Sequence, residues 1–515
     1  MDLLSSFFLF WINWKWKINF NKIIVKSVIL LLLCSIVFYS DLYSQGKNNM
    51  YLFGYGGPCR GTMNLFLGSP IVTADSARTD NISLTHANVS DLTGNLLFYT
   101  NGKEVRDGNY EIMPNGTGLN PCQYTSTCPY GLINYQGDII LPIPDDSNKY
   151  YLFHQALEYL SIYASSQIYF SMIDMSLNNG MGDVLIKNIS FYQDTLSGGM
   201  NTACRHANGR DWWLIIPKAF EPTYKIFLVS PYGVQLFNTQ TIGQRSDVGQ
   251  AAFSPDGNYW GYYDYNLGLD IMDFDRCSGM LSNARHVNVN DSVWGHGFSF
   301  SPDSKLAYAT NNLNLYQFNI DSVDLSSSMQ IVAQWDSSFS PTPPWMTGFD
   351  FMQIGPDNKI YMTTNATTLS MQYINYPDSI GTACDMKQHS IPLPTFNDHT
   401  IPNFPNYFLG PVIGSVCDSL GLSITENIYD QNLKLSIRPS PASDNFYLDY
   451  ELPTGKDATM LVYDAVGRKV YAQPLYSVNK LLQVHCDSWS PGVYTVKLKM
   501  NKDPFAAHIK VVVTR

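Results

Sequence analysis

An internal repeat restricts the fold of this chain more than any other feature of its sequence. Three segments share one pattern, an apolar strand, a turn built on Pro-Asp and a second apolar strand: AAFSPDGNYWGYYDYN (251–266), FSFSPDSKLAYATNN (298–312) and FMQIGPDNKIYMTTN (351–365). In each turn the proline fixes φ, the aspartate bonds to the turn backbone, and the next residue tolerates the conformation that closes a hairpin. The turn prolines lie 47 and 54 residues apart. A period of about 45 to 55 residues with several strands per unit indicates the blades of a β-propeller.

Earlier parts of the chain repeat the pattern with less regular turns. RHANGRDWWLIIPK (205–218) places Asn208 and Gly209 where Asp256 and Gly257 stand in a later repeat, and DLTGNLLFYTNG (91–102) reads as another hairpin. YLFGYGG (51–57) is either one more hairpin or a strand that closes the ring. We predict an all-β fold with a propeller of seven blades over residues 45–415, with six blades as the alternative.

The composition agrees with a mostly β protein. Charged residues make up 15% of the chain and aromatic residues 14%, with 34 Tyr and 28 Pro. This balance favours strands and turns over long surface helices. The net charge of −11 argues against nucleic acid as a partner, because phosphate-backbone binding needs clustered Lys and Arg.

The repeat stops near Ile424, and a differently patterned unit follows. LSIRPSPASDNFYLDYEL, ATMLVYDAVGRKVYAQPL, LLQVHCDSWSPGVYTVKLKM and FAAHIKVVVTR alternate apolar and polar residues between turn signals. This alternation predicts a small Ig-like antiparallel β-sandwich with one solvated face per sheet. We place it at residues 435–515, after a linker at 416–434.

The N-terminus has the pattern of an export signal. Four lysines between residues 15 and 26 precede an uncharged run of 14 residues from Ser27 to Ser40. That length suits a signal h-region and falls short of the roughly 18 residues that a membrane-spanning helix needs. We predict a signal peptide at 1–44, cleaved between Ser44 and Gln45, and no transmembrane anchor in the mature form. An uncleaved anchor is the alternative, because the segment before the apolar run is long and itself apolar.

The cysteines leave several arrangements open. Of nine cysteines, Cys34 falls in the predicted signal peptide, and the remaining eight permit disulfides in an oxidising compartment without fixing their pairing. Cys122 and Cys128, in CQYTSTC, form the easiest pair to envisage, while several buried free thiols are the alternative. No CxxC occurs, so a tetrahedral zinc site with the usual close spacing is not indicated. We predict no metal site and no cofactor.

The repeat region resembles known exported propellers. Its SPDG hairpins resemble the WD40-like repeats of periplasmic β-propellers. The order GNLLFYTNG, IMPNGTGL, YYLFHQ, MIDMSLNNGMGDV and RHANGRDWWLI is similar to a large group of exported propeller proteins of Bacteroidetes, over most of residues 50–410. This resemblance implies the fold and the export, and it carries no activity.

The C-terminal unit resembles the sorting domain of type A cargo of the type IX secretion system of Bacteroidetes. PSPAS (439–443), YDAVGRKV (463–470), SPGVYTVKL (490–498) and the terminal HIKVVVTR stand where that family usually has PNPA, DxxGxxV, GxYxV and a basic, apolar end; Ser440 replaces the Asn. The residues that carry the match are Pro439, Pro441, Ala442, Asp464, Gly467, Gly492, Tyr494 and Lys510.

The resemblance implies where the protein goes. It implies Sec export through the periplasm and then secretion to the outer surface or the medium, with the type IX machinery of the outer membrane as a partner of residues 435–515. A purely structural alternative makes this unit a lid or a dimerisation module.

The common catalytic motifs are missing from the sequence. It contains no GxSxG, no HExxH and no GxxxxGK[ST], so we assign no catalytic residue. SPDGNYW (254–260) is similar to the sialidase Asp box, but Gly257 follows Asp256 directly and Trp260 comes one place early.

Three sets of residues are candidates for binding. Asp273 and Asp275 alternate on one strand and suit a cation, although such a pair more often faces solvent. Five histidines are candidates for convergence at the ring axis, against a structural or surface role: His206, His286, His296, His389 and His399. Six tryptophans suit stacking on sugar rings or, as we favour, packing between blades: Trp212, Trp213, Trp260, Trp294, Trp335 and Trp345.

We expect a binding module more than an enzyme. The leading hypothesis is a secreted or surface propeller that binds glycan or protein through one face or the central channel. The alternative is a polysaccharide-active hydrolase or lyase with acidic residues of several blades converging at the axis. A passive surface component without a defined pocket is the third hypothesis.

Overall fold

The structure is a computed structural model of the chain. It describes residues 46–57, 59–158, 163–244, 249–289, 293–340, 344–418, 434–452, 457–464, 468–476, 481–500 and 507–514. The predicted signal peptide, its cleavage site at Ser44 and Gln45, and Gly467 of the sorting motif lie outside these residues. The chain forms two compact units, one built from most of the repeat region and one that contains the C-terminal strands.

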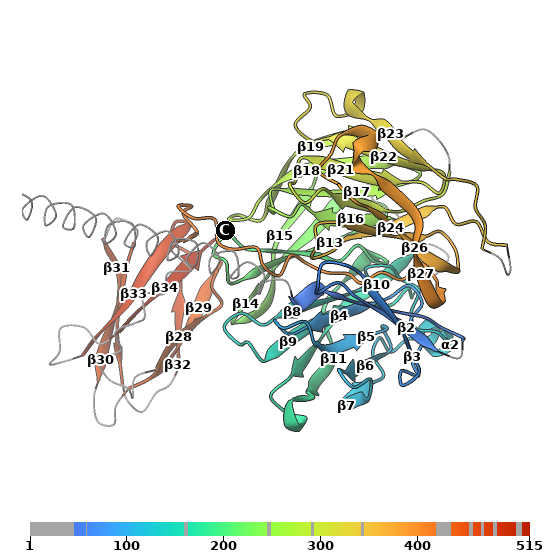
Figure 1. Cartoon of the computed structure of the whole chain (residues 1–515). Helices are drawn as coiled ribbons and strands as arrows, with labels where there is room; N and C mark the ends of the chain where they lie inside the picture. Colours follow the sequence, from blue (N-terminus) through green and yellow to red (C-terminus); the bar gives the residue numbers. More distant parts are fainter. Residues whose placement is uncertain are drawn as a thin grey trace, which may run out of the picture. The chain divides into compact units, whose positions relative to one another are not determined.

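The described residues from Met50 to Asn397 form seven antiparallel sheets, as the repeat predicts (Figure 1). In chain order the sheets are β1 (Met50–Phe53), β2 (Arg60–Asn64), β3 (Ile71–Asp75); β4 (Ala87–Ser90), β5 (Leu96–Thr100), β6 (Glu104–Asp107), β7 (Ile112–Thr117); β8 (Asp138–Pro142), β9 (Lys149–His154), β10 (Ala164–Asp174), β11 (Asp183–Ser197); β12 (Thr202–Arg205), β13 (Trp212–Pro217), β14 (Thr223–Ser230), β15 (Gly233–Thr241); β16 (Gln250–Phe253), β17 (Tyr259–Asp264), β18 (Gly268–Asp275), β19 (Met280–Val287); β20 (Phe298–Phe300), β21 (Leu306–Thr310), β22 (Asn314–Asn319), β23 (Gln330–Gln334); and β24 (Phe349–Ile354), β25 (Ile360–Thr364), β26 (Thr368–Ile374), β27 (Met386–Asn397). Six of these sheets have four strands and the first has three.

The sheets follow one another around a common axis. First strands of successive sheets are neighbours, as β4 is to β8 and β16 is to β20. At the closure β27, the last strand of the seventh sheet, lies against the strands of the first sheet. The edge-to-face contact of Tyr51 on β1 with Tyr361 on β25, with ring centroids 5.8 Å apart, supports this closure. These contacts are those of a closed seven-bladed propeller.

The Pro-Asp turns form as their residues predict. Gly257, Ser304 and Asn358, which follow the turn aspartates, all have left-handed φ values, of 75°, 62° and 61°. Each donates its backbone N–H to the carbonyl three residues earlier, at 2.9, 2.9 and 3.1 Å. The aspartate carboxylates close the turns, since Asp256 accepts a bond from Ser254 Oγ at 2.6 Å and Asp303 one from Ser301 Oγ at 2.7 Å.

Large aromatic side chains fill the space between the sheets. Trp212, Trp213 and Trp260 are fully buried. Each donates its indole N–H outside its own sheet: Trp260 to Thr202 Oγ1 at 2.9 Å, Trp213 to the carbonyl of Arg276 at 2.7 Å and Trp212 to that of Pro142 at 3.2 Å. These three tryptophans therefore pack between blades, the role that the sequence favoured.

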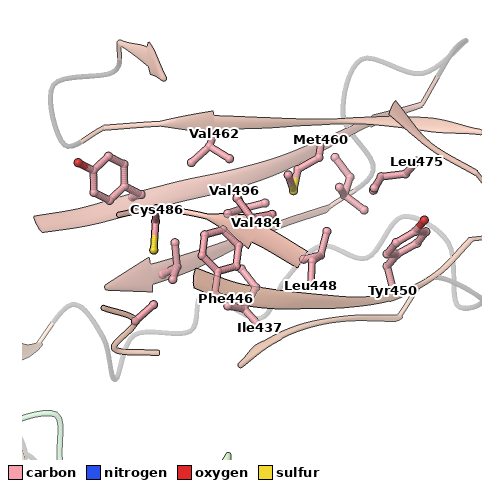
Figure 2. Packing of buried hydrophobic residues seen from close by; sticks show 14 of the residues in the cluster. Ile437, Phe446, Leu448, Tyr450, Met460, Val462, Leu475, Val484, Cys486 and Val496 are labelled. Carbon is pink, nitrogen blue, oxygen red and sulfur yellow. The ribbon is translucent and has the colours of Figure 1, made fainter. Parts of the chain in front are cut away.

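The C-terminal strands form a two-sheet sandwich of the predicted kind. One sheet is ordered β28 (Lys434–Arg438), β29 (Asn445–Glu451), β32 (Leu481–His485), and the other β31 (Lys469–Leu475), β30 (Ala458–Tyr463), β33 (Gly492–Met500), β34 (Ala507–Val513). Alternate residues of β29 and β30 are buried. Figure 2 shows Phe446, Leu448 and Val484 of the first sheet packed with Met460 and Val496 of the second. The core is therefore formed by the inner faces of both sheets.

Helices are few and short in the described residues. They comprise one α-helix, α2 (Gln123–Thr127), and the 3-10 turns η1 (Gly46–Asn48), η3 (Asn178–Gly180), η4 (Ser326–Ser328) and η5 (Gly381–Cys384). Among these residues no helix has the length and apolar character to cross a membrane.

The cysteines do not pair as the spacing suggested. Cys122 and Cys128 are free thiols. Cys122 caps the N-terminus of α2, and its sulfur accepts a hydrogen bond from the backbone N–H of Thr125. Cys277 and Cys417 are the disulfide-bonded cysteines of the described residues, while Cys204, Cys384 and Cys486 are buried free thiols.

Candidate functional site at the propeller axis

The connections between strands divide into two groups at opposite ends of the sheets. Because consecutive strands are antiparallel, the turn from the first to the second strand and the turn from the second to the third lie at opposite ends. The Pro-Asp turns belong to the first group. The turns from the second to the third strand lie at the other end of the propeller. The loops that lead into the first strand of each sheet lie at that same end. The candidate site lies among these loops.

A pocket of about 470 Å³ opens on this end of the axis. Loops from all parts of the ring line it: Leu84, Ile133, Asn134, Tyr135, Leu157, Tyr163, Ser197, Gly198, Gly199, Met200, Gly249, Tyr265, Trp294, His296, Asn312, Asp350, Phe351, Asn365, Asp398 and His399. Residues that are as much as 315 positions apart in the chain thus meet at one site.

Aromatic rings form much of the pocket wall. Tyr135 stacks on Phe351 with ring centroids 3.5 Å apart, and Phe351 stacks in turn on the imidazole of His296 at 5.5 Å. On another side Tyr265 and Trp294 stack at 5.3 Å, and the Trp294 side chain is 61% exposed. The pocket therefore presents flat, apolar ring faces to whatever enters it.

A buried carboxylate held by two imidazoles is the main polar feature of the pocket. Asp350, on β24, is fully buried. Its Oδ1 lies 3.3 Å from Nδ1 of His296, and its Oδ2 is bonded to Nδ1 of His399. The three residues come from the loop before β20, from β24 and from the segment after β27, so ring closure is what brings them together.

The pKa values of this cluster are coupled through Asp350. Burial raises the pKa of Asp350, but the charge of His399 and the hydrogen bonds from both imidazoles outweigh burial and lower it to about 2. Burial lowers the pKa of His399, and the charge of Asp350 more than offsets this, so the pKa is raised above its ordinary value. Near neutral pH, Asp350 is therefore an anion facing a readily protonated His399.

Side-chain amides close the inner end of the pocket. Gln136 exchanges two bonds with the backbone of Ala251, at 2.8 and 3.0 Å. Gln250 donates to the hydroxyl of Tyr135 at 2.9 Å, and its Oε1 accepts the backbone N–H groups of Phe298 and Met352, both at 2.9 Å. These bonds link inner strands of several blades and make a rigid floor.

The segment after His399 continues through the channel. Asn403 donates to the carbonyls of Asp138 and Asn201 at 3.0 Å each, and Tyr407 donates to that of Ile140 at 2.9 Å. Asn406 reaches the carbonyl of Pro255, in a Pro-Asp turn, at 2.8 Å. Residues 400–406 therefore cross from the pocket end of the axis to the Pro-Asp end.

The structure brings two of the five candidate histidines together, His296 and His399. His286 instead lies 2.8 Å from Oδ1 of Asp270, and His389 lies 3.2 Å from Oδ1 of Asp336; neither lines the pocket. His206 belongs to the second compact unit.

Of the candidate tryptophans, Trp294 lies in the pocket. Trp335 donates its indole N–H to the carbonyl of Ser338 at 3.2 Å, and Trp345 is 49% exposed outside the pocket.

The candidate carboxylates of the turns and of β18 have structural partners. Asp256 closes its hairpin, at the end of the propeller opposite the pocket. Asp273 accepts bonds from Asn283 at 3.1 Å and from Arg285 at 3.4 Å, and Asp275 accepts one from Ser278 at 2.6 Å. The residues that the structure describes contain no group of three or more metal-binding side chains.

The described sorting-motif residues hold the ends of the sandwich together. The backbone of Ala442 pairs with Val512 and Thr514, at 2.8 Å in each bond. Asp464 accepts the backbone N–H of Arg468 at 2.8 Å, and Tyr494 donates to the carbonyl of Ser490 at 2.7 Å. Gly492 begins β33, Lys510 lies on β34, and Pro439 and Pro441 follow β28. Their role in sorting stays a prediction.

The sequence contained a signal for the pocket that its motifs did not reveal. The residue six places before each turn proline is Gly249, His296 or Asp350, and all three line the pocket. At Gly249 a Cβ atom would lie 1.9 Å from the carbonyl oxygen of Tyr263, so glycine is required there. Asp350 was also detectable as a charged residue inside an apolar strand, FDFMQI.

Comparison with solved structures finds distant similarities to propeller-like proteins. A proposed 6-phosphogluconolactonase from Bacteroides fragilis is 13% identical, with 68% of this chain and 97% of that chain covered and a TM-score of 0.40. A quinoprotein alcohol dehydrogenase-like protein from Bacteroides thetaiotaomicron is 12% identical, with coverage of 68% and 79% and a TM-score of 0.35. These likenesses carry no information about activity.

Comparison of sequences concerns the C-terminal unit. No curated protein matches the chain. Residues 436–514 match the family described as the secretion system C-terminal sorting domain. This unit thus marks the protein as cargo of the type IX secretion system, carried to the cell surface or the extracellular space.

Proposed function

We propose that this secreted propeller is a recognition protein that binds a saccharide in the axial pocket. In this proposal residues 1–44 are a signal peptide cleaved before Gln45, residues 45–415 are the recognition domain, and residues 416–434 link it to the sorting domain. The observation that carries the proposal is the pairing of stacked aromatic rings with hydrogen-bonding side chains in one pocket.

The dimensions of the pocket suit a small ligand. Its volume of about 470 Å³ falls within the range of roughly 300–1,000 Å³ that is usual for such sites. The floor of glutamine and asparagine bonds is fixed by backbone partners, so the pocket exists before any ligand arrives.

The chemistry of the lining suits the two kinds of surface that a sugar ring has. Exposed Trp294, backed by Tyr265, offers a flat face to the C–H groups of a sugar. Asn312 and Asn365, with the two histidines, offer polar groups to its hydroxyls. The described lining residues include no Lys or Arg, which favours a neutral sugar over a polyanion.

Glycoside cleavage by two carboxylates has less support than binding. That chemistry uses one carboxyl group as an acid and a second as a base or nucleophile. Both oxygens of Asp350 are held by imidazoles. Asp398 accepts Ser83 Oγ at 3.0 Å and Thr367 Oγ1 at 3.4 Å.

A glycan array tests the proposal directly. The secreted protein is labelled and applied to an array of bacterial, plant and animal glycans, and hits are measured by isothermal titration calorimetry. We expect Trp294→Ala to weaken binding at least about tenfold, equivalent to ~1.4 kcal/mol. Trp345→Ala, an exposed tryptophan outside the pocket, is the matched control and should bind as the wild type does. The proposal is contradicted if the wild type binds no glycan on the array, or if Trp294→Ala and Trp345→Ala lose affinity equally.

A further inference from the structure

His296 has one nitrogen fixed and one free to react. Its Nδ1 lies 3.3 Å from Oδ1 of Asp350, and its ring is stacked on Phe351 and set edge-on to Tyr265 at 5.6 Å. Because a carboxylate only accepts hydrogen bonds, the proton of the neutral ring sits on Nδ1. Nε2 then carries a lone pair, and it makes no hydrogen bond with any residue in the described ranges. The side chain is 24% exposed, so the pocket reaches it.

His399 supplies the complementary group. Its Nδ1 is bonded to the other oxygen of the same carboxylate, and the charge of Asp350 favours its protonated form. Its Nε2 lies 3.7 Å from Oδ1 of Asp398, an ion pair that is too long for a direct hydrogen bond. This N–H is therefore a donor available to a ligand, next to the base that His296 provides.

An imidazole base oriented by a buried carboxylate, beside a second imidazole that donates, is a pair suited to acyl transfer to water. Hydrolysis of a glycosidic bond usually requires a pair of carboxyl groups instead. A neutral ester needs no cationic side chain to hold it, in keeping with a described lining that lacks Lys and Arg.

We propose that the pocket is also a hydrolytic site for acyl esters carried by a saccharide, with His296 as the general base and His399 as the oxyanion donor. This inference rests on the proposed function, since the sugar is what the pocket holds. His296 Nε2 takes a proton from water while the water oxygen bonds to the ester carbonyl carbon. The Nε2–H of His399 stabilises the resulting oxyanion.

Collapse of the tetrahedral intermediate completes the reaction. The bond from the carbonyl carbon to the sugar oxygen breaks, and His296 returns its proton to that oxygen. The products are the sugar hydroxyl and a carboxylic acid. Water is the only co-reactant, and no group is oxidised or reduced.

The test measures acid release by the full chain from three probes: 4-nitrophenyl acetate, acetylated xylan and acetylated glucomannan. We expect turnover that falls at least about 100-fold in kcat in His296→Gln, the loss typical of removing a general base. The control is His389→Gln, whose imidazole contacts Asp336 outside the pocket and which should leave kcat unchanged. Thermal unfolding of each variant checks that the fold is kept.

The outcomes separate this inference from the proposed function. Glycan binding that depends on Trp294, together with no acid release from any of the three probes, overturns the hydrolytic role and leaves recognition standing. Acid release that is equal in wild type and His296→Gln also overturns it. A wild-type protein that neither binds any glycan nor releases acid from any probe contradicts both proposals.

Discussion

At the scale of single residues, two buried carboxyl groups show how partners decide charge. Asp350 is held by two imidazoles and remains an anion. Asp138, on β8, has a single long bond from Thr100 Oγ1 at 3.4 Å, and its Oδ1 has no partner among the described residues. Burial raises the pKa of Asp138 to about 8. Asp138 is therefore a protonated, structural acid at neutral pH, and Asp350 is the charge around which the site is built.

The raised pKa of Asp138 predicts a pH dependence of stability. The folded protein keeps a proton that the unfolded chain releases near pH 4, so the stabilisation is present below pH 4 and is lost as the pH rises to about 8. The loss is on the order of 5 kcal/mol at most. We expect Asp138→Asn to remove this pH-dependent loss of stability. In urea unfolding the variant should then be more stable than the wild type at pH 8, and the difference between the two proteins should be smaller at pH 4.5.

Asp321→Asn, at an exposed aspartate, is the control for that measurement and should follow the wild type at both pH values. A gain for Asp138→Asn that is the same at pH 4.5 and pH 8 contradicts the assignment of a buried proton to Asp138.

At the scale of elements, the Pro-Asp turn explains both the repeat and its variation. Gly257, Ser304 and Asn358 share a left-handed backbone, a conformation that costs most L-residues about 1 to 2 kcal/mol. Glycine avoids this cost, and asparagine tolerates it better than other residues do. The Ser304 hydroxyl also accepts the backbone N–H of Asp256 at 3.1 Å, so one turn supports the next.

Asn358 offers a clean test of that backbone requirement, because it is exposed. Asn358→Ala should lower the free energy of unfolding by about 1 kcal/mol, while Asn358→Gly should equal or exceed the wild type. Thermal and urea unfolding give both values. Equal stabilities for the alanine and glycine variants would show that the turn does not need this conformation.

These elements also show what could be predicted from the sequence. The hairpins, the number of blades and the sandwich followed from local patterns, because Pro-Asp turns and alternating strands are encoded within a few residues. The pocket followed only in part. His296 and His399 were among five candidates, but their partner Asp350 depends on closure of a ring that spans hundreds of residues, which no local pattern reports. Cys122 and Cys128 are free thiols, which their spacing alone did not indicate.

At the scale of the whole molecule, the sorting domain and the axial pocket belong to different parts of the chain. The sandwich has a core of its own, in which Val496 is fully buried on β33. The match to the sorting family covers residues 436–514, and the pocket residues all lie between Leu84 and His399. Substitutions in the sandwich should therefore affect secretion without altering the pocket. Substitutions in the pocket should leave secretion unchanged.

A charge in the core of the sandwich tests this separation. Val496→Asp buries an unpaired carboxylate, which should unfold the sorting domain and retain the protein inside the cell. Val493→Asp makes the same change at a 37% exposed position of the same strand and serves as the control. Immunoblots of cell fractions and medium measure the outcome. Normal secretion of Val496→Asp would contradict a folded sorting domain as the export signal.

A crystal structure of the protein soaked with a mixture of common monosaccharides and the glycans retained on the array tests the central claim most directly. Our account predicts ligand density in the axial pocket, with a sugar ring on Trp294 and its polar groups within hydrogen-bond distance of His296 or His399. Density confined to another surface, such as the end of the propeller that carries the Pro-Asp turns, would contradict the claim that the axial pocket is the functional site.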